Sequence, residues 1–249
     1  MKSILVCNWK MNPATYREAK LLFDATKKSA VKAKNIQLIV APPTIFLYPL
    51  SEKYRGAIAF AMQNGYAEAS GAHTGETAYA QGKQARATYT LVGHAERRAL
   101  GETNENTRTK VAGAIKAGLM PILCIGEEVR SVAGEHFSYI KEQLRIGLGG
   151  VQPLSLKKIM IAYEPVWAIG AAQPMTPRDM HEMSIFIRKS VVDLYGEAGM
   201  EIKILYGGSI DETTAPEMLR NGDVHGLLVG RASADPRTIT TLISAIASA

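Results

Sequence analysis

The amino-acid sequence predicts an α/β protein built as a closed (β/α)8 barrel. Three observations lead to this fold class. Eight short apolar runs occur along the chain, longer segments with helical periodicity lie between them, and no strong break interrupts the alternation. The length of 249 residues suits eight strand–helix units, which occupy about 250 residues in barrels of this kind. The alternation indicates parallel strands joined by crossover helices.

The first element of each unit is predicted to be a strand, because it is a short continuous run of apolar, often β-branched residues. Runs without polar alternation are typical of strands that are buried on both faces. The eight predicted strands are residues 4–7, 36–41, 57–62, 89–92, 120–125, 159–163, 202–206 and 226–229.

The second element of the clearest units is predicted to be an amphipathic helix. Two of these helices have a start signal, Thr176-Pro177 and Asp235-Pro236, in which a capping side chain precedes a proline at the first helical position. The five clearest predicted helices are residues 14–31, 104–117, 135–148, 177–195 and 236–247.

An open, doubly wound sheet is the alternative architecture. That fold usually carries Gly-x-Gly-x-x-Gly after its first strand, whereas the first predicted strand here is followed by Asn8-Trp9-Lys10. The chain contains no linker rich in Pro, Gly or Ser and no low-complexity tract. Residues 1–249 are therefore expected to form one domain.

The composition is that of an ordinary globular protein. Hydrophobic residues make up 47% and charged residues 21% of the chain, which excludes collagen-like, disordered and disulfide-scaffold classes. The net charge is +6, but the basic residues are scattered along the chain, so a nucleic-acid-binding surface is not favoured. The excess of positive charge fits either a small anionic substrate or simple solubility.

The two cysteines and the first residues of the chain indicate a reducing compartment. Cys7 and Cys124 lie in separate apolar runs without metal-ligand spacing, and are expected to be buried thiols. The N-terminal residues do not have the apolar region of a signal peptide, and no run of 18 apolar residues occurs. We expect a cytoplasmic protein that does not associate with membranes.

Polar residues and glycines follow five of the predicted strands. In a (β/α)8 barrel the carboxyl ends of the strands and the loops after them form the active site. These residues are therefore expected to meet at one mouth of the barrel, although each alone has an ordinary structural explanation. They are Asn8, Lys10, His94, Glu96, Glu164, Gly207, Gly208, Ser209, Gly230 and Arg231.

Four segments resemble the motifs of the triosephosphate isomerase family, in the order and spacing of that family. The resemblance extends over nearly the whole chain and implies a TIM barrel. The segments are Asn8-Trp9-Lys10-Met11-Asn12, Gly93-His94-Ala95-Glu96-Arg97-Arg98, Ala162-Tyr163-Glu164-Pro165-Val166-Trp167-Ala168-Ile169-Gly170 and Leu205-Tyr206-Gly207-Gly208-Ser209.

The resemblance implies interconversion of a short aldose phosphate and its ketose through an enediolate, without cofactor or metal. Glu164 would be the base that moves the proton between neighbouring carbons. His94, at a helix start that disfavours an imidazolium, would polarise the carbonyl as a neutral ring. Lys10 would stabilise negative charge and Asn8 would orient the substrate oxygen. Glu96 is implied to be a buried partner of Lys10.

The same resemblance assigns a phosphate site and a lid. Backbone N–H groups of Gly207, Gly208, Ser209, Gly230 and Arg231 would bind the phosphate, as glycine turns behind the seventh and eighth strands of such barrels do. The Gly170 amide would be a further donor, on a lid that closes as a unit. The lid residues are Pro165, Val166, Trp167, Ala168, Ile169, Gly170, Ala171 and Ala172.

Three departures from the common family sequence limit the assignment. Ala95 stands where a serine is usual, so the resting position of Glu164 is expected to differ. Ala171-Ala172-Gln173-Pro174-Met175 replaces the usual glycine-containing hinge, and a proline removes backbone freedom there. Arg231 replaces the second residue of a glycine pair.

These departures keep two alternatives open. One is a paralogue with the same chemistry that acts on a four-carbon ketose phosphate of the erythrulose phosphate type. The other is an inactive barrel that serves as a binding protein, although Lys10, His94 and Glu164 are all present.

Residues 63–76 resemble the family's interdigitating loop, which crosses to a second subunit. A loop of this length without its own secondary structure usually has such a role. A two-fold homodimer is expected, and the contact residues would be Thr74, Glu76, Met11 and Arg97.

Overall fold

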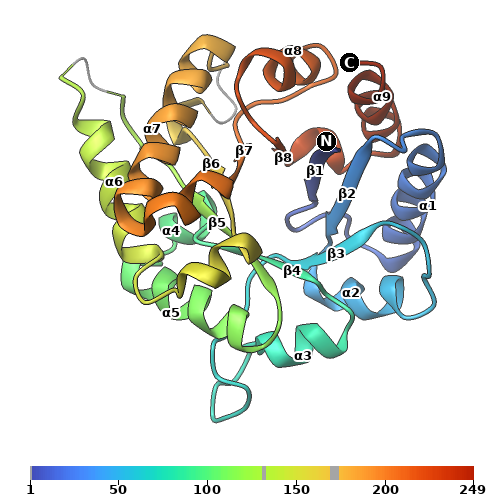
Figure 1. The fold of residues 1–249 in the computed structure, drawn as a ribbon. Coiled ribbons are helices and arrows are strands. Elements are labelled where there is room, and N and C mark those ends of the chain that lie inside the picture. Colours follow the sequence, from blue (N-terminus) through green and yellow to red (C-terminus); the bar gives the residue numbers. More distant parts are fainter. Residues whose placement is uncertain (1, 131–132, 169–173) are drawn as a thin grey trace.

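The computed structural model of the protein describes residues 2–130, 133–168 and 174–249. Eight parallel strands form a closed barrel in which each strand pairs with its sequence neighbours and β8 pairs with β1 (Figure 1). The predicted fold class is confirmed. The strands are β1 (Ser3–Asn8), β2 (Ile36–Ala41), β3 (Ala59–Met62), β4 (Tyr89–Val92), β5 (Met120–Ile125), β6 (Met160–Tyr163), β7 (Lys203–Tyr206) and β8 (Gly226–Val229).

Helices surround the barrel, and the carboxy-terminal helix α9 packs on α1 next to the closing strands (Figure 1). The helices are α1 (Tyr16–Lys32), α2 (Thr44–Ser51), α3 (Tyr79–Gln84), α4 (Ala95–Ala99), α5 (Asn104–Lys116), α6 (Glu135–Gly147), α7 (Pro177–Tyr195), α8 (Thr214–Asn221) and α9 (Pro236–Ala247). Short 3-10 turns occur at Pro153–Lys158, Val166–Ala168, Gly196–Glu201 and Arg231–Ser233. Within the described part of the chain, no helix is both long and apolar enough to cross a bilayer.

The two helix-start signals are confirmed. The Thr176 hydroxyl accepts a hydrogen bond from the backbone N–H of Asp179 at the start of α7, and the Asp235 carboxylate accepts from Arg237 and Thr238 at the start of α9. Both helices have proline in their first turn, where a missing N–H costs no intrahelical hydrogen bond.

Three strands begin later than the sequence predicts. Residues Ile159 and Ile202 have extended backbones and are buried, but each ends a 3-10 turn and is not part of a strand ladder. Ile58 donates its backbone N–H to the hydroxyl of Tyr54, at 3.1 Å. An apolar run therefore predicts burial at these positions correctly, whereas strand pairing depends on the neighbouring strands.

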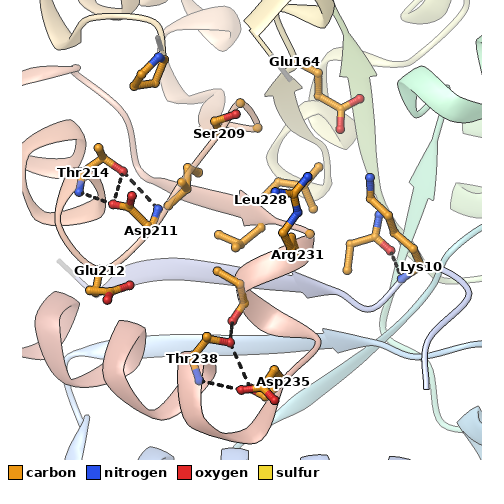
Figure 2. A pocket seen from close by; sticks show the side chains of 18 of the residues that line it. Lys10, Glu164, Ser209, Asp211, Glu212, Thr214, Leu228, Arg231, Asp235 and Thr238 are labelled. Atoms are coloured by element: carbon orange, nitrogen blue, oxygen red, sulfur yellow. Dashed lines mark hydrogen bonds between the residues drawn. The ribbon is translucent and has the colours of Figure 1, made fainter. Parts of the chain in front are cut away.

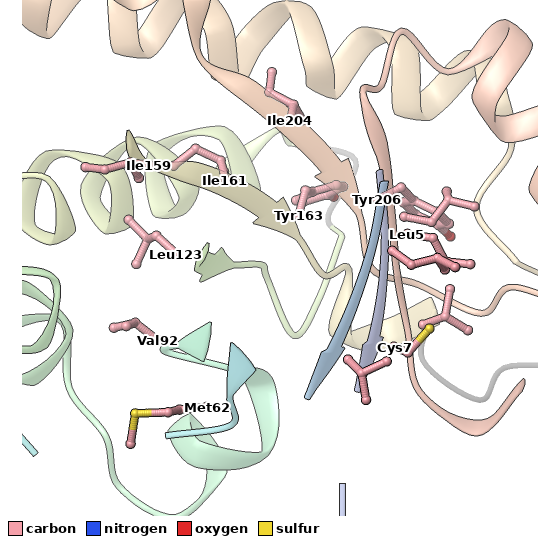
Figure 3. Packing of buried hydrophobic residues seen from close by; sticks show 14 of the residues in the cluster. Leu5, Cys7, Met62, Val92, Leu123, Ile159, Ile161, Tyr163, Ile204 and Tyr206 are labelled. Atoms are coloured by element: carbon pink, nitrogen blue, oxygen red, sulfur yellow. The ribbon is translucent and has the colours of Figure 1, made fainter. Parts of the chain in front are cut away.

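The strands bury both faces. Along β1, Leu5 and Cys7 belong to the core between strands and helices (Figure 3), whereas Ile4 and Val6 belong to a second cluster, which fills the barrel interior. Because side chains alternate across a strand, apolar residues are needed at every position. Cys7 and Cys124 are both buried and unpaired, as expected. Burial raises the pKa of the Cys7 thiol to about 12.

Candidate active site

A carboxylate and an imidazole meet at the carboxyl ends of β6 and β4. The Oε1 atom of Glu164 lies 3.3 Å from Nε2 of His94, and its Oε2 atom accepts a hydrogen bond of 3.0 Å from the backbone N–H of Ala95. Only 3% of Glu164 and 7% of His94 is exposed to solvent. The two side chains therefore contact each other in a largely dry environment, although 69 residues separate Ala95 from Glu164 in the sequence.

The backbone after β4 fixes the orientation of His94. Gly93 has a φ of +73°, and a Cβ atom there would lie 2.7 Å from the side chain of Thr107. His94 is the N-cap of α4, and its Nδ1 atom accepts a hydrogen bond of 3.2 Å from the backbone N–H of Glu96. An Nδ1 atom that accepts a backbone N–H carries no proton, so Nε2 carries the ring proton and directs it toward Glu164.

Burial controls the protonation of Glu164. Removal from water raises the pKa of this carboxyl above its ordinary value of 4.5, and this effect outweighs the opposing effects of His94, of the Ala95 N–H and of Lys10. A carboxylate with a raised pKa is a stronger base than an exposed one, which suits it to take a proton from carbon.

Lys10 follows β1 in a left-handed backbone conformation, with a φ of +54°. Two interactions hold this conformation. The Lys10 N–H donates to Oδ1 of Asn8 at 3.0 Å, and Nε2 of Gln63 donates to the carbonyl oxygens of Lys10 and Ala41, both at 2.8 Å. The backbone after β1 is thus fixed by a side chain that follows β3, and this directs the Lys10 ammonium toward the barrel mouth.

Glu96 pairs with Lys10 but is not buried. The Lys10 Nζ to Glu96 Oε1 distance is 2.5 Å, whereas 59% of the Glu96 side chain is exposed. In the isolated chain the carboxylate is therefore not buried, contrary to the expectation. The physical reason is that α4 is only five residues long and lies on the rim of the barrel, so that its second residue projects into solvent beside Lys10.

A cavity of about 640 Å³ opens at the barrel mouth, and Asn8, Lys10, His94 and Glu164 all line it. Figure 2 shows Lys10 and Glu164 in its wall. The loops after β7 and β8 form its other side. The predicted phosphate-site residues that line it are Gly207, Gly208, Ser209, Gly230 and Arg231.

Two of these glycines allow the loops to approach the polar side chains. A Cβ atom on Gly207 would lie 2.8 Å from Cγ of Glu164, and one on Gly230 would lie 3.0 Å from Cε of Lys10. Ser209 donates its hydroxyl to the carbonyl oxygen of Ala168 at 2.8 Å, which joins the loop after β7 to the segment after β6. The structure thus places the glycine loops directly beside Glu164 and Lys10.

The segment predicted as a lid begins with an ordered turn. Pro165 is buried, and Val166, Trp167 and Ala168 form a 3-10 turn. The remaining predicted lid residues, Ile169, Gly170, Ala171 and Ala172, lie outside the described residues.

Sequence reasoning missed Glu127, which follows β5. Its carboxylate is 2% exposed and accepts hydrogen bonds from the hydroxyl of Tyr163 and from Nε1 of Trp167, both at 2.8 Å. The Val166 N–H also donates to the Glu127 carbonyl oxygen, at 2.9 Å. Glu127 therefore anchors the turn that follows Glu164. The available signal was a carboxylate one glycine beyond the end of the predicted strand 120–125.

The predicted contact residues for a second subunit lie at the surface. Met11 is 91% exposed, Thr74 and Glu76 are exposed, and Arg97 lies 3.7 Å from the carboxylate of Glu102. The loop that carries Thr74 and Glu76 projects away from the barrel (Figure 1).

The fold and the site define a class of protein, a (β/α)8 barrel with an acid–base pair and a cation at the carboxyl ends of its strands. Within the described ranges, no cluster of three or more His, Cys, Asp or Glu side chains could hold a metal ion.

Comparison with known proteins places the chain within this class. The family model described as triosephosphate isomerase matches residues 3–246. The chain is 36% identical to the triosephosphate isomerase of Endomicrobium trichonymphae, over 97% of this chain and 98% of that protein. It is 35% identical to that of Aquifex aeolicus, over 98% and 99%, and 38% identical to that of Dehalococcoides mccartyi, over 94% and 93%. The chain belongs to the triosephosphate isomerase family.

Proposed function

We propose that this protein interconverts D-glyceraldehyde 3-phosphate and dihydroxyacetone phosphate through an enediolate. The observation that carries the proposal is the 3.3 Å contact between the buried Glu164 carboxylate and Nε2 of His94. The family membership supports the same reaction. In this proposal residues 1–249 act as one catalytic domain in the cytoplasm.

The reaction moves a proton between two adjacent carbons of the substrate, and it needs a base and an electrophile from the protein. Glu164 removes a proton from the carbon next to the carbonyl, the electron pair forms the carbon–carbon double bond, and the carbonyl oxygen takes up negative charge. The Nε2–H group of His94 donates a hydrogen bond to that oxygen. His94 then passes its Nε2 proton to that oxygen and takes up the hydroxyl proton of the first carbon, where a new carbonyl forms. Glu164 returns its proton to the second carbon, so that the molecule as a whole is neither oxidised nor reduced.

Positive charge at the mouth stabilises the intermediate. The Lys10 ammonium acts on the enediolate oxygens, and Asn8 orients one of them. Glu96 has a supporting role, because its ion pair holds the ammonium in one position. Fixed charges act more strongly in a dry site than in water, which is why the burial of Glu164 matters to the rate.

The phosphate is proposed to bind between the loops after β7 and β8. Gly207, Gly208, Ser209, Gly230 and Arg231 all line the cavity beside Glu164. The Gly207 N–H is already bonded to the carbonyl oxygen of Tyr163, so the donors to the phosphate would be the N–H groups of the other four residues. Gly170 is a further proposed donor on the lid. Lid closure excludes water, which would otherwise allow the enediolate to eliminate its phosphate.

A coupled assay with both triose phosphates tests this function. Isomerisation at rates typical of an efficient enzyme supports it. Much faster turnover of a four-carbon ketose phosphate assigns the protein to the paralogous activity. Absence of isomerisation together with retained phosphate binding indicates a binding protein.

The pKa of Glu164 can be measured without substrate. We expect the free enzyme to show a carboxyl resonance that titrates above 4.5, because burial raises the pKa of Glu164. The carboxyl is therefore protonated below that raised pKa and ionised above it, so the active base is lost as the pH falls. A ¹³C titration of labelled glutamate, with the Glu164→Gln variant used to assign the signal, separates this ionisation from that of the substrate phosphate, whose second pKa is about 6. A value at or below 4.5 would contradict the expectation.

The protein is also proposed to form a homodimer. Met11, with 91% of its surface exposed, is an apolar side chain next to the active-site residue Lys10, and a second subunit would cover it. We expect sedimentation at micromolar protein to give twice the chain mass of 27.0 kDa. Met11→Glu should shift the protein toward the monomer, and a wild-type protein that sediments only as a monomer would overturn the proposal.

A further inference from the structure

The side chain of Arg231 brings a guanidinium to the pocket, directly after the glycine that ends β8. Arg231 lines the same cavity as Lys10 and Glu164. Figure 2 shows its side chain pointing into the space between Ser209 and Lys10. A glycine at this position would offer a backbone N–H and nothing else, so the arginine adds a cation to a corner that otherwise consists of amides.

The other cation of the pocket already has a counter-charge. The ammonium of Lys10 lies 2.5 Å from the Glu96 carboxylate, and the two charges balance each other at the rim. An incoming phosphate would have to compete with Glu96 for Lys10. The guanidinium of Arg231 has no such competitor, because it makes no hydrogen bond or ion pair with any residue that the structure describes.

Asp211, Glu212 and Asp235 line the same cavity, and none of them forms an ion pair with Arg231 among the described residues. Asp211 and Asp235 accept backbone N–H groups instead. Asp211 accepts the backbone N–H groups of Thr213 and Thr214, at 3.0 and 2.8 Å. Asp235 accepts the N–H of Thr238 at 3.0 Å, as part of the cap of α9. Both carboxylates lie in the cavity wall without a salt bridge to Arg231. The position of the guanidinium is thus not explained by pairing within the chain.

We propose that the Arg231 guanidinium binds the phosphate group of the substrate, in addition to the backbone amides of the loops after β7 and β8. The planar guanidinium can donate two parallel N–H groups to a phosphate, and a charge-assisted pair of this kind is stronger than an amide contact. The inference rests on the proposed function, which identifies the anion as a phosphate monoester. It makes Arg231 a residue that determines specificity for dianionic substrates.

Binding of inorganic phosphate tests the inference without any isomerisation. Calorimetry on the wild-type protein, Arg231→Gln and Arg231→Lys should show that the Gln variant raises the Kd for phosphate about ten- to hundredfold, as expected for the loss of a charged hydrogen-bonding partner. The Lys variant should lie between the two, because an ammonium retains the charge but not the planar pair of donors. The KM for the triose phosphate should rise in parallel.

Arg220→Gln is the matched control. It removes the same charge from an exposed residue at the end of α8, outside the cavity, and should leave phosphate affinity unchanged. Thermal melts of all variants check folding, which the loss of an exposed, unpaired side chain should not affect. If Arg231→Gln binds phosphate like the wild type, the inference is overturned. If phosphate binding depends on Arg231 but no isomerisation occurs, the inference stands and the proposed reaction fails.

Discussion

Replacing Glu164 with glutamine is expected to lower kcat about 10³- to 10⁴-fold, the upper range of what a general base contributes. The amide cannot take a proton from carbon, and no other described carboxylate contacts His94 so closely, since the Glu96 oxygen lies 4.0 Å from Nδ1 on the far side of the ring. A coupled assay in both directions measures the loss. Affinity for inorganic phosphate should remain measurable, because the phosphate corner lies on the loops after β7 and β8.

The same substitution tests the protonation state of the imidazole. The Glu164 carboxylate faces two donors, the Ala95 N–H and His94 Nε2, and a glutamine has only one oxygen with which to accept them. The amide nitrogen must then face a donor, so the His94 ring signals in an NMR spectrum should shift.

Glu212→Gln is the control for this experiment. It neutralises an exposed carboxylate in the wall of the same cavity and should retain near wild-type kcat. A Glu164→Gln variant with comparable turnover would show that the proton transfer uses another base.

The position of Glu164 depends on contacts between neighbouring strands. Its backbone N–H donates to the carbonyl oxygen of Ile125 at 2.7 Å, which extends the pairing of β5 and β6 by one residue beyond the strand end. The Gly207 N–H in turn donates to the carbonyl oxygen of Tyr163 at 2.8 Å. Glu164 is therefore held by the sheet itself, and in the proposed reaction a side chain on rigid backbone needs little reorganisation.

The sequence predicted the residues whose position follows from topology. In a closed parallel barrel all strands end at one mouth, so a polar residue within two positions after an apolar run must lie there. Asn8, His94 and Glu164 are such residues, and the structure brings them to one cavity. Residues that act over long separations were missed. Gln63 contacts Lys10 across 53 residues, and Glu127 contacts Trp167 across 40, and no local pattern specifies either pair.

The sequence also did not predict how far the Lys10–Glu96 pair is exposed to solvent. The partnership of Lys10 and Glu96 followed from the family resemblance, but whether water reaches the pair depends on how far α4 extends over the barrel mouth. In the same way, the extended backbones at Ile159 and Ile202 follow from their residue type, whereas their separation from the ladder depends on the 3-10 turns before them. The burial and extended backbones of the apolar runs were predictable, whereas the exposure of Glu96 and the limits of the strands depend on tertiary contacts.

Replacing Gly126 with alanine is expected to destabilise the fold by about 3 kcal/mol or more, because the new methyl group cannot be accommodated without moving backbone. A Cβ atom there would overlap the carbonyl oxygen of Glu164. Gly126 cannot shift easily, since Gln143 holds it by accepting its N–H at 2.8 Å and donating to its carbonyl oxygen at 3.2 Å. The strain must therefore move the backbone of Glu164, and kcat/KM should fall about 10²-fold, the effect of roughly 1 Å of displacement of a catalytic group.

Chemical denaturation and steady-state kinetics on the same samples measure both effects, and Gly150→Ala is the matched control. Gly150 has a φ of +84° and no neighbouring atom within 4 Å of the added methyl group. Its substitution should cost only the left-handed backbone strain of about 1–2 kcal/mol, with kcat/KM unchanged. Comparing Gly126→Ala with Gly150→Ala separates the effect of backbone strain from that of displacing Glu164. If Gly126→Ala loses stability without losing activity, Glu164 is not held by the β5–β6 backbone contact, and its position must instead depend on the bond from Ala95 and the contact with His94.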